Sequence, residues 1–266
     1  MTTPVTMPDV TTTPARIPVL DQATIAGPVH PRPGGRVPGG VRAGLRAAGL
    51  VAAKDLRLES RTHDAVGTVG LFALLILVTA SFALPTGGPD RAGIAAGTLW
   101  MAILFASLLG IGRTQALESE EGCLDALLLA PVAREYLFLG KLAASLLFTV
   151  AVEMALVPVL LLLMQVPVGS GLALLLAALG LGTLGLVGSG CLFAVIAVRT
   201  RMRQALLPAL VMPVAVPLMI ASVQATGAAL TGATVGANMH WLALLVGFDA
   251  MVLLVAVLAF PQLVEE

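Results

Sequence analysis

Charged side chains are scarce in this chain of 266 residues. Asp, Glu, Lys and Arg together make up 11% of it, whereas hydrophobic residues make up 58%. A soluble globular protein carries about 25% charged residues, so a soluble fold of this size is excluded and a membrane protein with several spans is predicted. The net charge at pH 7 is zero, so the composition gives no indication of a nucleic-acid partner.

Residues that commonly bind metals or haem are few as well. The two cysteines, Cys123 and Cys191, form no Cys-x-x-Cys pair, so neither a disulfide nor a metal site is predicted. A haem ligand normally lies in an apolar, aromatic pocket, but aromatic residues make up only 4%. The three histidines are scattered at His30, His63 and His240. His240 stands beside Trp241 and is interpreted as an interfacial anchor, with contact to haem as the weaker alternative.

The N-terminal part differs in kind from the rest. Residues 1–40 contain eight of the seventeen prolines together with many Thr and Gly residues, which predicts a disordered tail. Residues 41–64 mix Ala, Leu and Arg, a composition that favours helix. A basic amphipathic helix before a span is typical of an interfacial helix on an anionic leaflet. The alternative is a solvated helix without a membrane role, because its periodicity is irregular.

Six long apolar runs follow, and each is long enough for a helix that crosses a bilayer, which needs about 20 residues. Pro, Gly or charged residues separate them, and they lie at residues 65–84, 92–112, 142–164, 172–198, 205–223 and 241–260. The sequence therefore predicts an all-α membrane protein whose membrane domain, residues 65–262, has six spans.

The Lys and Arg residues predict how this domain is oriented. With the N-terminus inside, fourteen of the fifteen fall on the cytoplasmic side, and only Arg91 falls outside. Cytoplasmic segments of membrane proteins carry an excess of Lys and Arg. Both termini are therefore predicted to be cytoplasmic, and so is the charged segment between the second and third runs.

This charged segment runs from Arg113 to Lys141 and joins acidic residues to a leucine cluster that Pro131 ends. We interpret it as a cytoplasmic coupling-type helix that docks onto another protein, a motor subunit, because exposed leucines would cost about 25 cal/mol per Å² in water. The alternative is an ordinary solvated loop. The proposed docking residues are Glu118, Glu120, Glu121, Gly122, Asp125, Leu127, Leu128 and Pro131.

Residues 97–142 resemble the CcmB family, the permease subunits of the ABC-type cytochrome c maturation system. The resemblance rests on a Trp-led second span, an Arg, a Glu-rich turn with Gly, a Leu-Leu-Leu-x-Pro run and a Lys before the third span. These are Trp100, Arg113, Glu118, Glu121, Gly122, Leu127, Leu128, Leu129, Pro131 and Lys141. Residues 54–84 and the proline-punctuated residues 206–220 also resemble this family.

The resemblance implies several partners and a bacterial inner-membrane location. The partners would be the ATPase CcmA, the membrane proteins CcmC and CcmD, a second copy of this chain, and the haem chaperone CcmE indirectly. No GxxxxGK[ST] motif occurs in the sequence, so ATP would be hydrolysed by a separate subunit and this chain is not predicted to be an enzyme. Haem would be a handled or transported ligand rather than a bound cofactor.

Two acidic residues lie midway along predicted spans, Glu153 in the third and Asp249 in the sixth. A charge at that depth costs at least about 2.5–3.5 kcal/mol unless it is paired or hydrated, so a functional role is the default hypothesis. They either line a polar cavity or carry protons, or they are neutral carboxyls that fix helix packing. A proton-coupled secondary carrier that uses both is thus the alternative function, and a non-transporting scaffold is another.

Backbone-altering residues mark two of the spans. Pro208, Pro213 and Pro217 punctuate the fifth span and predict hinges or, alternatively, static kinks. The fourth span contains a row of small residues that includes Gly185 and Ser189. Small residues allow helices to approach closely, so this row predicts a packing or dimer face.

Overall fold

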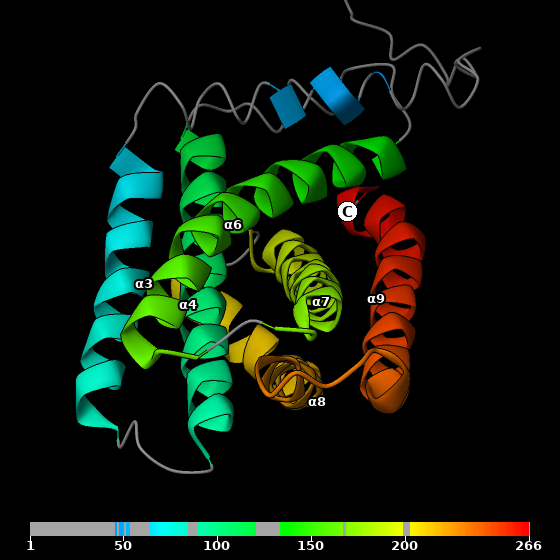
Figure 1. Ribbon diagram of the computed structural model, residues 1–266. Helices are drawn as coiled ribbons and strands as arrows, with labels where there is room; N and C mark the ends of the chain where they lie inside the picture. Colours follow the sequence, from blue (N-terminus) through cyan, green and yellow to red (C-terminus); the bar gives the residue numbers. More distant parts are fainter. Residues whose placement is uncertain are drawn as a thin grey trace, which may run out of the picture. The chain divides into compact units, whose positions relative to one another are not determined.

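The computed structural model describes residues 46, 48–50, 52–53, 64–84, 90–120, 134–166, 169–198 and 203–265. Within these ranges the secondary structure is helical and contains no strand. The elements are α3 (Asp64–Ala83), α4 (Arg91–Glu120), α6 (Arg134–Met164), α7 (Leu172–Val198), α8 (Arg203–Leu230), the 3-10 helix η1 (Gly236–Asn238) and α9 (Met239–Glu265). Figure 1 shows these helices as one bundle.

Five helices, α4, α6, α7, α8 and α9, are long and apolar enough to cross a membrane. The chain is therefore a multi-pass, all-helical membrane protein, as predicted. The first predicted span falls on α3, in which the described apolar stretch covers residues 67–83 and is shorter than the others. The total of six spans and the orientation stay predictions, and the tail and the interfacial helix fall mostly outside the described residues.

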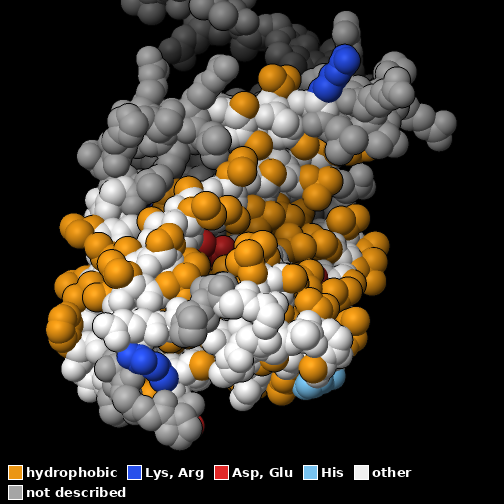
Figure 2. Space-filling model, in the orientation of Figure 1, with side chains coloured by type: hydrophobic (Ala, Val, Ile, Leu, Met, Phe, Trp, Pro, Cys, Tyr) orange, Lys and Arg blue, Asp and Glu red, His pale blue; other side chains and the backbone are white. Residues whose placement is uncertain are grey.

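The bundle is built around α4 and α7. In their spans 72% and 61% of the residues are buried, against 28–33% in α6, α8 and α9. Helix α7 packs against α4, α6, α8 and α9, and Figure 1 shows it among these four helices. The outer helices leave many large apolar side chains exposed, and Figure 2 shows hydrophobic side chains over much of the middle of one face, with a few acidic atoms recessed among them.

Glycines explain why α7 can occupy this central place. A methyl group added at Gly182 would overlap the Trp100 ring of α4 and approach Ser222 of α8. Another at Gly185 would overlap the Asp249 carboxylate of α9. The small-residue row is thus a packing face inside the chain, in agreement with the packing interpretation.

Several helix ends differ from the predicted spans. Helix α8 continues past residue 223 to Leu230, because Ala, Thr and Gly residues extend the helix until Gly232 ends it with φ +84°. The amide N–H of Gly232 donates to the carbonyl of Ala229 at 3.0 Å and that of Ala233 to Ala228 at 3.0 Å, as in a glycine-capped helix end. A helix end of this kind needs no charged residue, so the hydropathy pattern did not indicate where α8 would end.

The helices on either side of the charged segment are also longer than predicted. Helix α4 runs to Glu120, and α6 begins at Arg134, so Lys141 lies inside a helix instead of opening a span. Figure 1 shows that α6 first crosses one end of the bundle and then bends to run along α3 and α4, both of which it contacts. We call this the Arg134 end, and the opposite end, where α4 begins, the Arg91 end.

The packing of Gly182 leads to a first prediction. Gly182→Ala should destabilise the protein by about 1–3 kcal/mol, because overpacking forces Trp100 to move. The matched control is Gly180→Ala on the same helix, where an added methyl group meets nothing within 4 Å and should be neutral or slightly stabilising. The thermal midpoints of the two purified full-length variants test this, and equal midpoints would contradict it.

Candidate functional site

The proposed docking segment joins α4 to α6 at the Arg134 end. Glu118 and Glu120 lie in the last turn of α4, where their side chains are not described. The remaining docking residues, Glu121, Gly122, Asp125, Leu127, Leu128 and Pro131, lie outside the described residues. Helix α4 therefore reaches into the segment, α6 begins three residues after Pro131, and docking itself stays a prediction.

Glu153 lies on α6 and is almost fully buried, with 6% of its surface exposed. Its carboxylate oxygen Oε1 accepts a short hydrogen bond from the Thr183 hydroxyl of α7. Thr183 is buried as well. The contact places a charge-capable group between two helices and gives it a donor, which reduces the cost of its burial. Glu153 therefore joins α6 to α7.

Asp249 lies on α9, and only 4% of its surface is exposed. Neither of its carboxylate oxygens has a hydrogen-bond partner within the described part of the chain. The same holds for the Ser222 hydroxyl of α8. Asp249 faces Gly185 and Ser222 faces Gly182, and these glycines are one helical turn apart on α7. Two unpaired polar groups thus lie close to the same face of the central helix.

Helix α7 stands between the two buried acids. Thr183 and Gly185, which contact Glu153 and Asp249, are two positions apart and so point about 200° apart around the helix axis. The acids therefore do not form a shared carboxylate pair. Their surroundings also differ, because Glu153 has a donor and Asp249 has none among the residues that the structure describes. Of the two, Asp249 is better suited to bind a proton or another polar partner.

The prolines predicted as hinges lie in one unbroken helix. Pro208, Pro213 and Pro217 are all inside α8. Pro213 and Pro217 are exposed, and Pro208 is half-buried, so they face mainly away from the core. Each proline leaves one backbone carbonyl without its helical donor. A hinge role is neither shown nor contradicted by this arrangement and stays a prediction.

A buried hydrogen bond between α4 and α8 is a feature that the sequence reasoning missed. The Trp100 indole N–H donates to the Thr226 hydroxyl at 2.9 Å, and neither side chain is exposed. A tryptophan buried in an apolar span usually needs a partner for its N–H group. That requirement was a signal in the sequence, but it did not indicate which hydroxyl would meet it.

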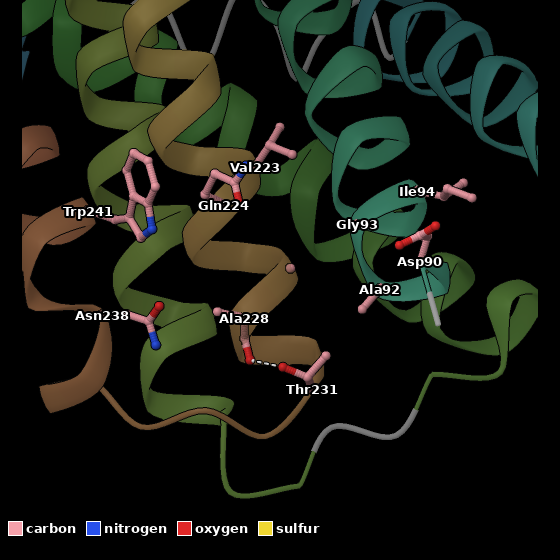
Figure 3. Close-up of a pocket in the computed structure, with 11 residues that line it drawn as sticks. Asp90, Ala92, Gly93, Ile94, Val223, Gln224, Ala228, Thr231, Asn238 and Trp241 are labelled. Atoms are coloured by element: carbon pink, nitrogen blue, oxygen red, sulfur yellow. Dashed lines mark hydrogen bonds between the residues drawn. The ribbon is translucent and has the colours of Figure 1, made fainter. Parts of the chain in front are cut away.

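At the Arg91 end, a pocket of about 540 Å³ opens where α4 begins, α8 ends and α9 begins (Figure 3). We call it the Trp241 pocket. Its polar lining residues are Asp90, Gln224, Thr231, Asn238 and Trp241, and its apolar ones are Ala92, Gly93, Ile94, Val223, Gly227 and Ala228. None of these is a His, Cys, Met, Tyr or Lys, so this lining offers haem iron no ligand.

His240 does not belong to this lining. Its ring packs against that of Trp241 with centroids 4.8 Å apart and an interplanar angle of 46°. The side chain is exposed. The geometry is compatible with the interfacial anchor predicted for this pair and gives His240 no position over the pocket.

Comparisons with known proteins match most of the chain. The family described as "CcmB protein" matches residues 46–266. The "Heme exporter protein B" of Paracoccus denitrificans is 35% identical over 181 residues, which cover 68% of this chain and 82% of that protein. The proteins of the same name from Rhodobacter capsulatus and Bradyrhizobium diazoefficiens are 33% and 30% identical, over 63% and 71% of this chain and 76% and 84% of their own lengths.

A second prediction tests the contact between Thr183 and Glu153. Thr183→Val should lower the free energy of unfolding by about 1–3 kcal/mol, because it leaves a buried carboxyl without its donor. The matched control is Thr149→Val, since the equally buried Thr149 hydroxyl only donates to the Ser145 carbonyl of its own helix at 2.9 Å.

The readout is the thermal midpoint of the purified full-length protein. Adding Glu153→Leu to Thr183→Val should recover part of the loss, because removing both polar partners costs less than removing one. Equal losses from Thr183→Val and Thr149→Val would show that the contact contributes nothing specific.

Proposed function

Because the chain belongs to the CcmB family, we propose that it is the membrane permease subunit of a haem-export complex that acts in cytochrome c maturation. The observation that carries this proposal is the family match over residues 46–266, together with relatives named "Heme exporter protein B". The five long apolar helices are what a permease subunit requires. The location would be the bacterial inner membrane, with both termini in the cytoplasm.

The energy would come from a separate ATPase subunit, because the sequence has no GxxxxGK[ST] motif. That subunit, similar to CcmA, would dock on residues 118–131. Helix α4 reaches into this segment as far as Glu120, and α6 begins at Arg134, three residues after it, so movement of the segment would act on two spans. The segment is thus suited to receive mechanical force.

The other partners follow from the family. They would be proteins similar to CcmC and CcmD, a second copy of this chain, and the haem chaperone CcmE indirectly. The outer helices leave large apolar side chains exposed on α3, α6, α8 and α9, so there is surface for partners as well as for lipid.

Within the complex we favour a relay of movement over conduction of haem. The Trp241 pocket contains no residue that binds iron, and Glu153 is already engaged with Thr183. The proposed role is to transmit ATP-driven movement that releases the haem-loaded chaperone. Haem is in either case a cargo of the complex.

A third prediction concerns docking. Glu121→Lys combined with Leu127→Asp should abolish co-purification of the ATPase, because it reverses one charge and places another in the leucine cluster. The control is Glu265→Lys combined with Leu263→Asp, which makes the same two changes at the C-terminus on the same predicted side. An affinity pull-down from membranes measures the retained ATPase. Unchanged retention in the loop variant would refute the docking role.

The unpaired Asp249 carboxylate supports a second candidate function, a proton-coupled carrier. Proton carriers place ionisable groups inside the membrane, and Asp249 is buried without a donor in the described part of the chain, so one specific observation favours this function. It would require no ATPase. The two candidate functions therefore predict different effects of removing the charges of Glu153 and Asp249.

The fourth prediction separates them. Glu153→Gln combined with Asp249→Asn keeps the shape and hydrogen-bonding capacity of both side chains and removes their charge. A permease driven by an ATPase should retain most of its output, measured as haem-stained holocytochrome c in cells. Lost output with intact ATPase association would favour the carrier. A non-transporting scaffold is indicated instead if the variant with Glu121→Lys and Leu127→Asp lowers the yield of the complex and leaves its nucleotide turnover unchanged.

A further inference from the structure

The Trp241 pocket owes its space to small residues. Gly227 of α8 faces Gly93 of α4, and a methyl group at Gly227 would lie 3.7 Å from the Gly93 Cα. A methyl group at Gly93 meets nothing within 4 Å. The two helices thus touch through their backbones and leave room beside the contact. The resulting volume of about 540 Å³ lies within the range of ligand sites, about 300–1,000 Å³.

The charge of the lining is negative. Asp90 is its only ionisable side chain, since Arg91 does not line the pocket, and Asp90 makes no ion pair with any residue that the structure describes. An unpaired carboxylate favours a cationic group in the ligand and disfavours the carboxylates of haem. The first requirement on the ligand is therefore a positive charge near α4.

The other side of the pocket offers hydrogen-bond donors. Figure 3 shows Asp90 on the α4 side of α8 and Trp241 and Asn238 on the α9 side. The Trp241 indole N–H and the exposed Gln224 amide have no partner among the described residues. The Asn238 amide is held by its hydrogen bond to the Thr234 carbonyl at 3.2 Å. Free N–H groups bind acceptor oxygens, so the second requirement is a group such as phosphate or ester.

An apolar stripe leads away from the pocket along α8. Ile220, Val216 and Met212 precede Gln224 at intervals of four residues, so each lies beside the next on the helix surface, in a row that turns slowly around α8. They are 51%, 55% and 37% exposed. An acyl chain could lie along this stripe while its headgroup occupies the pocket. A water-soluble amine would leave the stripe uncovered, so the third requirement favours an amphipathic ligand.

We propose that the Trp241 pocket binds the headgroup of an aminophospholipid, phosphatidylethanolamine, with its ammonium group at Asp90 and its phosphate and ester oxygens at Gln224 and Trp241. This lipid meets all three requirements, whereas phosphatidylglycerol lacks the positive charge. The site lies at the end of the bundle that the Lys and Arg distribution predicts to face outward. It would make the position of α4, α8 and α9 sensitive to the lipid there.

The fifth prediction tests this site. Phosphatidylethanolamine should bind the full-length protein more tightly than phosphatidylglycerol with the same acyl chains. Gly93→Leu fills the pocket from an open position and should weaken the binding of phosphatidylethanolamine about tenfold, equivalent to about 1.4 kcal/mol. Asp90→Asn should reduce the difference between the two lipids. The matched control Gly97→Leu lies one turn further along α4, outside the lining and in open space, and should bind like the unaltered protein.

Native mass spectrometry of the detergent-solubilised chain, titrated with each lipid, measures these affinities. Equal binding by the unaltered protein and Gly93→Leu would overturn the proposal, and so would equal binding of the two lipids to the unaltered protein. Competition by free phosphoethanolamine as strong as that by the lipid would show that the ligand is a soluble amine instead. Haem binding that Gly93→Leu abolishes and Gly97→Leu retains would assign the pocket to haem and would also overturn it.

Discussion

Close approach of helices at glycines of α7 is the constraint on which the rest of this bundle depends. Gly182 and Gly185 leave no room for even a methyl group beside Trp100 and Asp249. Inside a membrane, water does not drive helices together, so association relies on van der Waals packing and hydrogen bonds. Both are short-ranged, and a side chain at these positions would separate α7 from α4 and α9.

The buried polar contacts add to this packing, since they form between helices that pack against each other. The hydrogen bond from Trp100 to Thr226 joins α4 to α8, which also approach closely at Gly93 and Gly227, and the bond from Thr183 to Glu153 joins α7 to α6. Asp249 is the exception, since it is equally buried and has no hydrogen-bond partner within the described ranges. A packed bundle that retains such a group either uses it in its function or lets a molecule from outside the chain hydrogen-bond to it. This difference is why Asp249, rather than Glu153, supports the alternative function.

Much of the fold was predictable because length and hydropathy alone determine which segments can cross a bilayer. The glycine row predicted a packing face, and the isolated carboxyls predicted buried acids. What the sequence could not supply was which helices meet. Glu153 and Thr183, Trp100 and Thr226, or Gly93 and Gly227 are far apart in the chain, and no periodicity connects them. The end of α8 was missed because Gly232 terminates it by backbone conformation, without a change in hydropathy.

Helix α4 physically joins the two features whose roles are proposed. It starts beside the Trp241 pocket and ends in the predicted docking segment, and its 30 residues span about 45 Å at 1.5 Å per residue. Its span, Arg91–Thr114, is also the most buried of the five, so a movement of α4 would act on the helices packed around it. A displacement at Glu120 could therefore be transmitted along α4 to Asp90 and to α7 and α8, which pack against it. On this view, occupancy of the pocket and docking of the ATPase act on the same helix from opposite ends.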